Sequence, residues 1–366
     1  RIFPNHKQPV FSKPVGGQSP VDLSLIYELH FKGGIQLEQA INKLIATGMV
    51  QYAEPRYLNY EHAVKISIKD ITEVLAPFNP NDPDITNFAS GMYYIGRIKC
   101  PDAWGVNTTT ARGDSTTVIG IVDSGTDIDH PDLKAKIRYN YKDPINGTDD
   151  DNDGYVDNFR GWDISENDNN PNVDNSTHGS HVSGCAAAAT NNNVGVASPG
   201  FNCTFLPVKC AKQASTTQIN NGYEGIVYAA DHGCHIINCS WGGPFGGQFG
   251  LDAVTYATIN KNALVVASAG NANNEVQNFP GSFDLALCVA STTSTDARSS
   301  FSTYGHTIDV CSPGSAIRST VYNNTYTNMD GTSMASPICA GAAGIVKTFY
   351  PTYNALQIGE QLLMGA

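Results

Sequence analysis

Four polar side chains that could cooperate in nucleophilic catalysis occur in separate parts of this 366-residue chain. Asp123 and Asn271 each follow a short apolar run, and His178 and Ser333 each precede a run of small residues. A serine beside a histidine base can attack a carbonyl carbon, a carboxylate can orient the histidine, and an amide N–H can bind the oxyanion. The four residues therefore suggest acyl transfer through a serine nucleophile.

Each of these residues also has an ordinary structural explanation. Asp123 is suited to cap the turn that follows it, and Asn271 follows a glycine, as turn asparagines often do. Ser333 would make a natural helix N-cap. His181 lies three positions after His178 and competes with it as a general base. Only the joint occurrence of the four residue types favours catalysis.

Ser333 has informative surroundings. It lies in Gly331-Thr-Ser-Met-Ala-Ser-Pro337, just before Ala340–Gly344, whose small residues predict a helix packed tightly into the core. Free N–H groups and a partial positive charge collect at a helix N-terminus. Placed there, Ser333 can present Oγ to a substrate while its own N–H faces the developing oxyanion.

Alternating strands and helices should hold these residues in place. Short apolar runs recur at Thr117–Val122, Thr204–Val208, His235–Cys239, Ala263–Ala267, Leu285–Ala290 and Ile308–Cys311, with helical stretches at 218–232 and 250–262. This alternation predicts an α/β fold in which helices cover both faces of a parallel sheet. Such sheets bind ligands beyond the carboxyl ends of their strands, which is where Asp123 and Asn271 fall.

The first 75 residues have a different pattern. Ser24–Phe31 and Val50–Pro55 are predicted strands, and Leu37–Ala46 is a predicted helix that Gly48 ends. Together they form a small α+β segment that precedes the rest of the chain. We expect two domains, residues 1–75 and residues 76–366.

Composition excludes some classes of function. Charged residues make up 15% of the chain and there are 35 glycines, which is typical of a compact, loop-rich protein. A net charge of −12 argues against nucleic acid as a partner. No apolar run approaches the roughly 18 residues of a membrane helix, so we expect no membrane span.

Nine cysteines occur, and none has the spacing of a metal site. Several lie inside apolar runs, where a cysteine acts as a small buried hydrophobic residue. Cys203 and Cys234 each precede a predicted strand, so a disulfide between them is the alternative.

An acidic loop near residue 150 is a candidate metal site. Asp149, Asp151, Asp153 and Asp157 match positions 1, 3, 5 and 9 of an EF-hand, although Arg160 stands at the twelfth position. Clustered carboxylates repel one another unless a cation lies among them. We expect a structural calcium ion here, and the alternative is a bare acidic loop.

Five blocks of the chain, in order, resemble the subtilase (subtilisin-like serine protease) family. The blocks are Ile121-Val-Asp-Ser-Gly125, His178-Gly-Ser-His-Val-Ser-Gly184, Ser240-Trp-Gly-Gly243, Ser268-Ala-Gly-Asn271 and Gly331-Thr-Ser-Met-Ala-Ser-Pro337. The order Asp, His, Ser along the chain is also that of subtilisin. The resemblance implies a subtilisin-like parallel sheet and a serine endopeptidase that acts on proteins or peptides.

The same resemblance implies a role for each catalytic candidate. Asp123 would orient His178, which would take the proton from Ser333, and Ser333 would form an acyl-enzyme. The side chain of Asn271 and the N–H of Ser333 would form the oxyanion hole. The match also favours His178 over His181 as the base.

Substrate-binding residues follow from the resemblance as well. Ser240-Trp-Gly-Gly243 (Ser240, Trp241, Gly242 and Gly243) matches a segment of the family. In the family, this segment pairs with the substrate backbone as an added strand. Trp241 would shape a more distal pocket. Ala269 and Gly270 would form the other wall of the first specificity pocket, with Asn278 at its floor. Many relatives have glycine there, so Asn278 should make this pocket shallower and more polar.

The front segment resembles part of an inhibitory propeptide. Residues 20–57 match its second β-α-β half, which implies a zymogen inhibited by its own propeptide and cut between Tyr57 and Asn79. The alternative is that residues 1–75 form a permanent accessory domain. Asp132 and Asn192 match a second calcium site of the family, to which Asp82 or Asp84 could add a ligand.

We therefore expect an exported protease, secreted, periplasmic or held at the cell surface, that acts as a monomer. Two alternatives from other classes remain. One is a catalytically silent binding module on the same fold, and the other is a calcium-binding surface protein that uses the acidic loop.

Overall fold

The computed structural model describes residues 29, 36–50, 53, 76–86, 91–106, 110–173, 176–212 and 218–366. The chain divides into two compact units, Arg1–Asp70 and Ile71–Ala366. In the first unit, helix α1 spans Leu37–Ala46, as the apolar spacing predicts, and Gly48 follows it with a positive φ of 66°. The two strands expected on either side of α1 fall largely outside the described residues.

The second unit is built on a seven-stranded sheet in which every neighbouring pair is parallel. Its strand order is β2-β3-β1-β4-β5-β6-β7. In chain order the strands are β1 (Val118–Asp123), β2 (Trp162–Asp163), β3 (Thr204–Lys209), β4 (Ile236–Cys239), β5 (Leu264–Ser268), β6 (Ala286–Thr292) and β7 (Val310–Pro313). Six of them correspond to the predicted apolar runs, whereas the two-residue strand β2 was not predicted.

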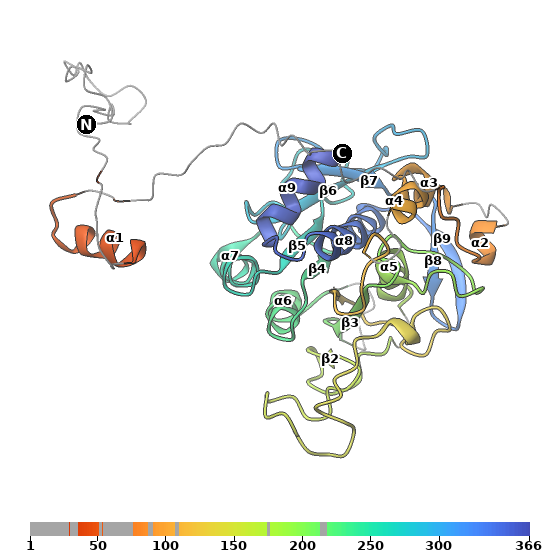
Figure 1. The fold of residues 1–366 in the computed structure, drawn as a ribbon, viewed down its shortest axis with the longest axis horizontal. Helices are drawn as coiled ribbons and strands as arrows, with labels where there is room; N and C mark the ends of the chain where they lie inside the picture. Colours follow the sequence, from red (N-terminus) through yellow and green to blue (C-terminus); the bar gives the residue numbers. More distant parts are fainter. Residues whose placement is uncertain are drawn as a thin grey trace. The chain divides into compact units, whose positions relative to one another are not determined.

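Helices cover both faces of this sheet, which confirms the expected architecture (Figure 1). Helices α5 (His178–Ala187), α8 (Thr332–Phe349) and α9 (Ala355–Gly365) lie on one face, and α6 (Gly222–Asp231) and α7 (Gly247–Thr255) lie on the other. A π-helical turn, η4 (Tyr256–Asn260), continues α7. Strand β1 shows the two-residue period, because Ile119 and Ile121 face α5 and α8 while Val118 and Val122 face α6.

Shorter elements complete the unit. They are the helices α2 (Pro83–Thr86), α3 (Tyr93–Arg97) and α4 (Cys100–Val106), the 3-10 turn η3 (Lys134–Lys136), and the antiparallel hairpin of β8 (Ile317–Val321) and β9 (Thr325–Met329). The hairpin packs on α5, since Ser319 Oγ donates to the His181 carbonyl at 2.8 Å and Thr320 Oγ1 donates to the Ser180 carbonyl at 2.7 Å. It thereby holds the helix that begins at His178.

All nine cysteines lie in the described part of the chain, and every one is a free thiol. Eight are buried, as expected for small hydrophobic residues. The alternative of a Cys203–Cys234 disulfide is wrong, because Cys203 belongs to the core on the α5 and α8 side of the sheet and Cys234 to the core on the α6 side. The sheet itself separates the two sulfurs.

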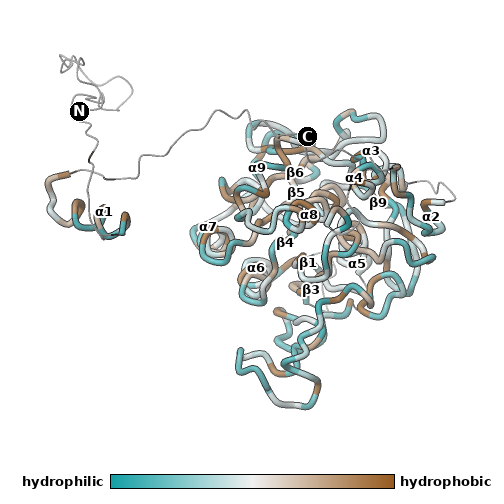
Figure 2. Tube along the Cα trace, viewed as in Figure 1, coloured by the Kyte–Doolittle hydropathy of each residue, from teal (hydrophilic) through white to brown (hydrophobic). Residues whose placement is uncertain are grey.

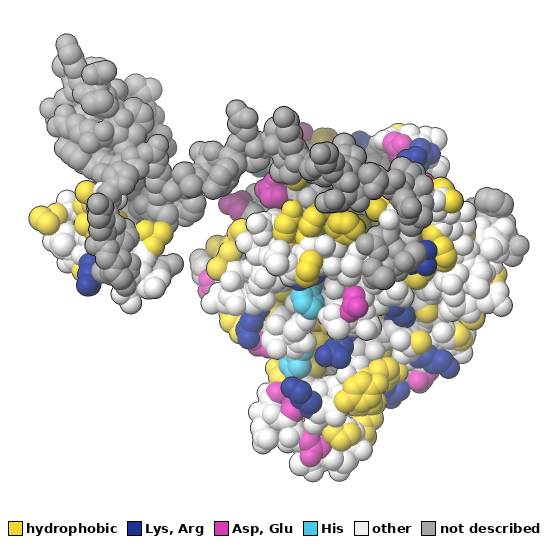
Figure 3. Space-filling view, viewed as in Figure 1, with side chains coloured by type: hydrophobic (Ala, Val, Ile, Leu, Met, Phe, Trp, Pro, Cys, Tyr) yellow, Lys and Arg dark blue, Asp and Glu magenta, His cyan; other side chains and the backbone are white. Residues whose placement is uncertain are grey.

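Polar and charged side chains are concentrated at the surface of the described part of the chain. The loop that contains residues 143–158 is mostly hydrophilic, in contrast to the apolar strands of the sheet (Figure 2). On the face drawn in Figure 3, acidic and basic side chains are interspersed. Among the described residues, no helix is long and apolar enough to cross a membrane.

Candidate active site

Asp123 and His178 meet at the carboxyl end of β1. The Asp123 side chain is 1% exposed, and its Oδ1 accepts a hydrogen bond from His178 Nδ1 at 2.8 Å and from the Ser124 N–H at 2.7 Å. A histidine that carries its proton on Nδ1 leaves a lone pair on Nε2. His178 is thereby prepared to accept a proton on the side away from Asp123.

Electrostatics around His178 favour its protonated form. Burial disfavours the imidazolium, but the charge of Asp123 and its hydrogen bond together outweigh burial and raise the pKa of His178 above its ordinary value. The imidazole can therefore hold the proton that a nucleophile would release.

His181, the competing histidine, has different surroundings. It is fully buried, and its Nε2 lies 2.9 Å from the Ile317 carbonyl and 3.2 Å from the Thr327 carbonyl of the β8–β9 hairpin. Burial lowers its pKa to about 4. His181 thus ties α5 to the hairpin as a neutral donor and takes no part in the group around Asp123.

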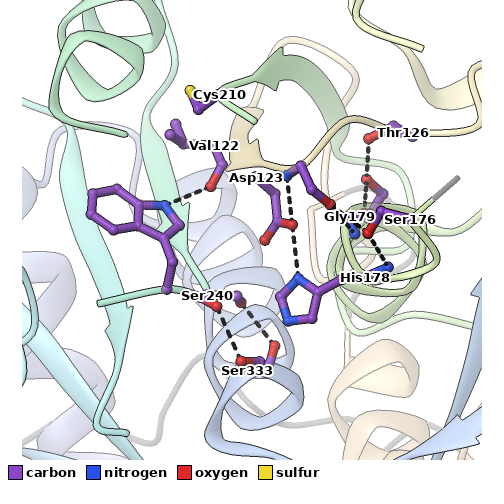
Figure 4. Close-up of polar contacts among 12 residues, drawn as sticks. Val122, Asp123, Thr126, Ser176, His178, Gly179, Cys210, Ser240 and Ser333 are labelled. Atoms are coloured by element: carbon purple, nitrogen blue, oxygen red, sulfur yellow. Dashed lines mark hydrogen bonds and ion pairs between the residues drawn. The ribbon is translucent and has the colours of Figure 1, made fainter. Parts of the chain in front are cut away.

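Ser333 lies in the first turn of α8, and Figure 4 shows the His178 ring between Asp123 and Ser333. Ser333 Oγ donates to the Ser240 carbonyl at 3.0 Å, and Ser240 Oγ donates to the Ser333 carbonyl at 2.8 Å. This pair of hydrogen bonds joins the end of β4 to the start of α8. To bond with His178 Nε2, the Ser333 hydroxyl has to rotate away from the Ser240 carbonyl.

The side-chain amide of Asn271 is held in place by Thr332, the residue before Ser333. Its Oδ1 accepts hydrogen bonds from the N–H and the Oγ1 of Thr332, both at 2.9 Å, while Thr332 Oγ1 accepts from the Gly270 N–H at 3.1 Å. Because the oxygen of the amide is occupied in this way, Nδ2 is left to donate elsewhere.

Gly331 leaves an opening between two donors. A Cβ placed on Gly331 would lie 3.4 Å from the Ser333 nitrogen and 3.5 Å from Asn271 Nδ2. The backbone N–H and the side-chain amide therefore border the same small space. An oxyanion in that space would have two donors within reach, at the N-terminus of α8.

A cleft of about 660 Å³ begins at Asp123 and His178. Its lining does not include Ser333, Asn271, Ala269, Gly270 or Asn278. Its walls include Asp123, Ser124, His178, Gln218, Ile219, Asn220, Tyr223, Ser240, Trp241, Gly242, Gly243, Phe245 and Phe279. The four residues expected to bind substrate backbone, 240–243, thus form one continuous wall. The volume is enough for several residues of an extended peptide.

Trp241 and Gly243 are held in this wall by neighbouring elements. Trp241 Nε1 donates to the Val122 carbonyl at 2.8 Å, and its ring meets Tyr223 edge-on with centroids 5.5 Å apart. Gly243 and Phe279 exchange two backbone hydrogen bonds of 3.0 and 2.8 Å. Hydrogen bonds to β1 and to Phe279 therefore hold this wall in place.

The Asn278 side chain lies close to Gly242 and Gly270. A Cβ on Gly242 would lie 2.3 Å from Asn278 Nδ2, and one on Gly270 would lie 3.3 Å from Asn278 Cγ. Nδ2 also donates to the Ser268 carbonyl at 2.9 Å. The carboxamide is thus fixed between the two glycines, and Ala269, which is buried, precedes the second of them.

The acidic loop assembles differently from the EF-hand match. Asp149 and Asp151 each bring a carboxylate oxygen within 4.8 Å of the other and of Asp143, which is fully buried and which the sequence pattern did not include. Asp151 Oδ1 is buried without a hydrogen-bond partner. The only sequence signal for Asp143 is its place six residues before Asp149.

The other two aspartates of the EF-hand match, Asp153 and Asp157, have their own partners. Asp153 Oδ2 lies 2.9 Å from His232 Nε2, at the end of α6. Asp157 Oδ1 accepts from the N–H groups of Asn146 and Gly147 at 2.8 and 2.9 Å. Both residues tie the loop together outside the cluster of Asp143, Asp149 and Asp151.

The second expected calcium site is a hydrogen-bonded network. Asp132, which is fully buried, accepts from Asn192 Nδ2 at 2.7 Å, from the Val196 N–H at 2.9 Å and from the Tyr326 hydroxyl at 3.0 Å. Burial raises the Asp132 pKa to about 6. To present its oxygen to a cation beside Asp132, the Asn192 amide would have to turn over.

Asp82 and Asp84 were the two further ligands suggested for that site, and of these two only Asp82 bonds through its carboxylate to the segment that contains Asn192. Asp82 accepts from the N–H groups of Asn191 and Asn192 at 2.8 and 3.2 Å. Asp84 instead forms an ion pair with Arg318, with Oδ2 and Nε 2.6 Å apart.

The fold and the similarity to known proteins together identify a serine protease of the subtilisin type. A model of the subtilase family matches residues 114–366, and the chain belongs to that family. Thermitase from Thermoactinomyces vulgaris is 39% identical over 74% of this chain and 85% of its own length. A thermophilic serine proteinase from Bacillus sp. (strain AK1) is 33% identical over 85% of this chain and 66% of its own length.

Solved structures agree on the fold. A protease from Pseudoalteromonas arctica superposes with a TM-score of 0.62 at 26% identity, covering 77% of this chain and 91% of that chain. A cold-adapted subtilisin-like serine proteinase superposes with a TM-score of 0.56 at 24% identity, covering 68% and 81%.

Proposed function

We propose that this subtilisin-like serine protease is an endopeptidase that uses Asp123, His178 and Ser333 as its catalytic triad. The observation that carries the proposal is the 2.8 Å hydrogen bond between His178 Nδ1 and the buried Asp123. The opposite edge of the imidazole ring lies toward Ser333 (Figure 4). Asp123 fixes the tautomer of His178, so that Nε2 is the nitrogen that accepts a proton.

The reaction begins when the Ser333 hydroxyl turns from the Ser240 carbonyl to His178 Nε2. Oγ attacks the peptide carbonyl carbon as its proton passes to Nε2, and the carbonyl oxygen becomes an oxyanion between Asn271 Nδ2 and the Ser333 N–H. Collapse expels the amine, which takes the proton from His178, and leaves an acyl-enzyme. Water then repeats the sequence and releases the acid.

Hydrolysis of a fluorescent protein substrate by the wild type and by Ser333→Ala tests this proposal. Loss of the triad serine should lower kcat on the order of 10⁶-fold while the fold persists. A Ser336→Ala variant is the matched control, because Ser336 lies on the same helix but its Oγ donates to Asn238 inside the core. Equal activity of the Ser333→Ala variant and the wild type would refute the triad.

A catalytically silent binding module is the second candidate, because Ser333 Oγ bonds to the Ser240 carbonyl and not to His178 in this structure. Catalytic hydrogen bonds often tighten only when substrate is bound. A wild type that binds peptides without cutting them, even after removal of residues 1–75, would favour this candidate.

The same protein is proposed to be a zymogen that is exported and processed. Residues 1–75 would act as the inhibitor, and the cut would fall between Tyr57 and Asn79. Mass spectrometry of the wild type after incubation should show a new N-terminus in that interval. The Ser333→Ala chain should stay intact if the cut is made by the enzyme itself, and a cut elsewhere would contradict the proposal.

Calcium is proposed as a structural ion at Asp143, Asp149 and Asp151. The unpartnered buried Oδ1 of Asp151 fits a cation, because a buried carboxylate oxygen without a donor is costly. Carboxylate oxygens are the ligands that this hard cation prefers. The ion would offset part of the negative charge of the loop and would take no part in peptide cleavage. Calcium at Asp132 and Asn192 stays a prediction.

A further inference from the structure

The segment that carries Asn271 is bound along one side by another loop. Residues 270–274 follow β5 and run beside residues 301–304, and Asn271 lies between two of the connecting bonds. The backbone hydrogen bonds are Thr303 N–H to Gly270 carbonyl at 2.9 Å, Asn273 N–H to Phe301 carbonyl at 2.9 Å, and Tyr304 N–H to Asn274 carbonyl at 3.0 Å. Any shift of residues 301–304 therefore shifts the backbone of Asn271.

Arg298 joins the same two segments through its side chain. Its Nη1 donates to Asn273 Oδ1 at 2.9 Å and to the Ser302 carbonyl at 2.7 Å, and it lies 3.3 Å from the Ser299 carbonyl. Its guanidinium carbon lies 4.7 Å from the centre of the Tyr304 ring. One charged group thus connects both segments two residues beyond Asn271.

The loop that Arg298 contacts is itself anchored to the sheet. Ser291 on β6 accepts the Ser299 N–H at 2.9 Å with its carbonyl, and its own N–H donates to Ser302 Oγ at 3.0 Å. Ser291 Oγ and Ser299 Oγ are 2.7 Å apart. All three serines are buried. A continuous set of hydrogen bonds therefore runs from β6 through this loop and Arg298 to Asn273.

We propose that Arg298 is a positioning residue for the oxyanion donor Asn271, an inference that rests on the proposed role of Asn271. Thr332 fixes the oxygen of the Asn271 amide, and Arg298 fixes the backbone from which that amide projects. Without Arg298 the 270–274 segment would keep its backbone hydrogen bonds but lose its side-chain tie to the anchored loop. Asn271 Nδ2 would then spend less time at the distance that transition-state stabilisation requires.

The test is a double-mutant cycle on kcat, measured with a peptide substrate and normalised to titrated active sites. Arg298→Ala should lower kcat about 10-fold with little change in KM, since small displacements of a catalytic group reduce the rate strongly. Arg298→Lys should recover part of the loss, because its ammonium group can still donate to one of the carbonyls. In an Asn271→Ala background, Arg298→Ala should have almost no further effect.

Arg97→Ala is the matched control. Arg97 is another exposed arginine that holds the preceding part of the same loop region, through an ion pair with Asp296 and a hydrogen bond to the Ser294 carbonyl. Within the described part of the chain, Arg97 forms no hydrogen bond or ion pair with residues 270–274. Its replacement should leave kcat unchanged.

The outcomes separate the two proposals. If Asn271→Ala lowers kcat about 10²–10³-fold, which is the usual effect of removing one oxyanion-hole donor, the oxyanion role stands. If Arg298→Ala then lowers kcat by the same factor in the Asn271→Ala background as in the wild type, the Arg298 inference is overturned and the oxyanion role of Asn271 is kept. If Asn271→Ala has no effect on kcat, the oxyanion role and the inference built on it both fail.

Discussion

His178 carries the charge change on which the proposed reaction depends. Its imidazole must be neutral to accept the Ser333 proton, and the charge of Asp123 raises its pKa in the free enzyme. A raised pKa means that the imidazolium, which cannot act as a base, persists to higher pH than it would for an isolated histidine. Activity is therefore present above this raised pKa and is lost as the pH falls through it.

We expect the acidic limb of the kcat/KM profile to have its midpoint above about 6.5, the ordinary histidine value. His181 does not contribute to this limb, because its own pKa is lowered to about 4. NMR titration of the His178 ring in the Ser333→Ala variant assigns the midpoint. A midpoint below the ordinary value would contradict the dominance of Asp123 over burial.

Asn278 sets the depth of the first specificity pocket in our interpretation. Replacing Asn278 with glycine removes the carboxamide that lies between Gly242 and Gly270. The ratio of kcat/KM for phenylalanine over alanine before the scissile bond should rise about 10-fold, because a larger apolar side chain can then be buried. Asn323→Gly, at an exposed turn of the β8–β9 hairpin, serves as the control. An unchanged ratio would place the pocket elsewhere.

At the scale of elements, small residues let α8 approach the rest of the core closely enough to place Ser333. A Cβ on Gly341 would lie 2.6 Å from the Ala186 carbonyl oxygen in α5 and 3.0 Å from the Gly200 nitrogen. Both are backbone atoms, so neither can move aside alone. The contact of α8 with α5 also fixes the separation between Ser333 and His178, which lie in the first turns of these two helices.

Gly341→Ala should therefore lower the free energy of unfolding by about 1–3 kcal/mol, because the added methyl group forces the helices apart. Gly359→Ala is the matched change in α9, where the nearest atom would be Leu264 Cδ1 at 3.7 Å. That variant should gain roughly 0.5–1 kcal/mol from helix propensity. Denaturant unfolding in the Ser333→Ala background, which prevents self-digestion, measures both. A neutral Gly341→Ala would show that α8 has room to move.

At the scale of the whole molecule, the net charge of −12 is partly concentrated in the loop around Asp143. This loop is tied to α6 by the contact of Asp153 with His232 and by Tyr155, whose ring meets that of Tyr228 at 4.8 Å. Helix α6 in turn supplies Tyr223 to the cleft wall. A cation in the loop would therefore stabilise one side of the catalytic unit.

Calcium should raise the melting temperature of the Ser333→Ala chain, and chelation should lower it. A calcium concentration 100-fold above Kd contributes about 2.7 kcal/mol. Asp143→Asn should remove most of this response, whereas Asp252→Asn on the exposed surface of α7 should keep it. Equal responses of the two variants to calcium would move the site away from Asp143.

The sequence by itself predicted the residues of the proposed catalytic group and determined on which kind of fold they lie. Asp123 ends a buried strand and Ser333 begins a helix of small residues, and these local patterns follow directly from side-chain periodicity and helix-end chemistry. The family blocks then favoured His178 over His181. The short strand β2 and the β8–β9 hairpin were not predicted, because β2 is two residues long and β9 is largely exposed, which leaves no apolar run.

Only the tertiary structure decided which distant groups meet. It brought Asp143 to Asp149 and Asp151, turned Asp153 toward His232, and placed Cys203 and Cys234 on opposite sides of the sheet. It also joined Arg298 to Asn273. Such contacts depend on the path of the backbone between residues far apart in the chain, and periodicity carries information only about near neighbours. The chemistry of a residue can be read from its local sequence, but its partners are fixed when the sheet and its helices close around it.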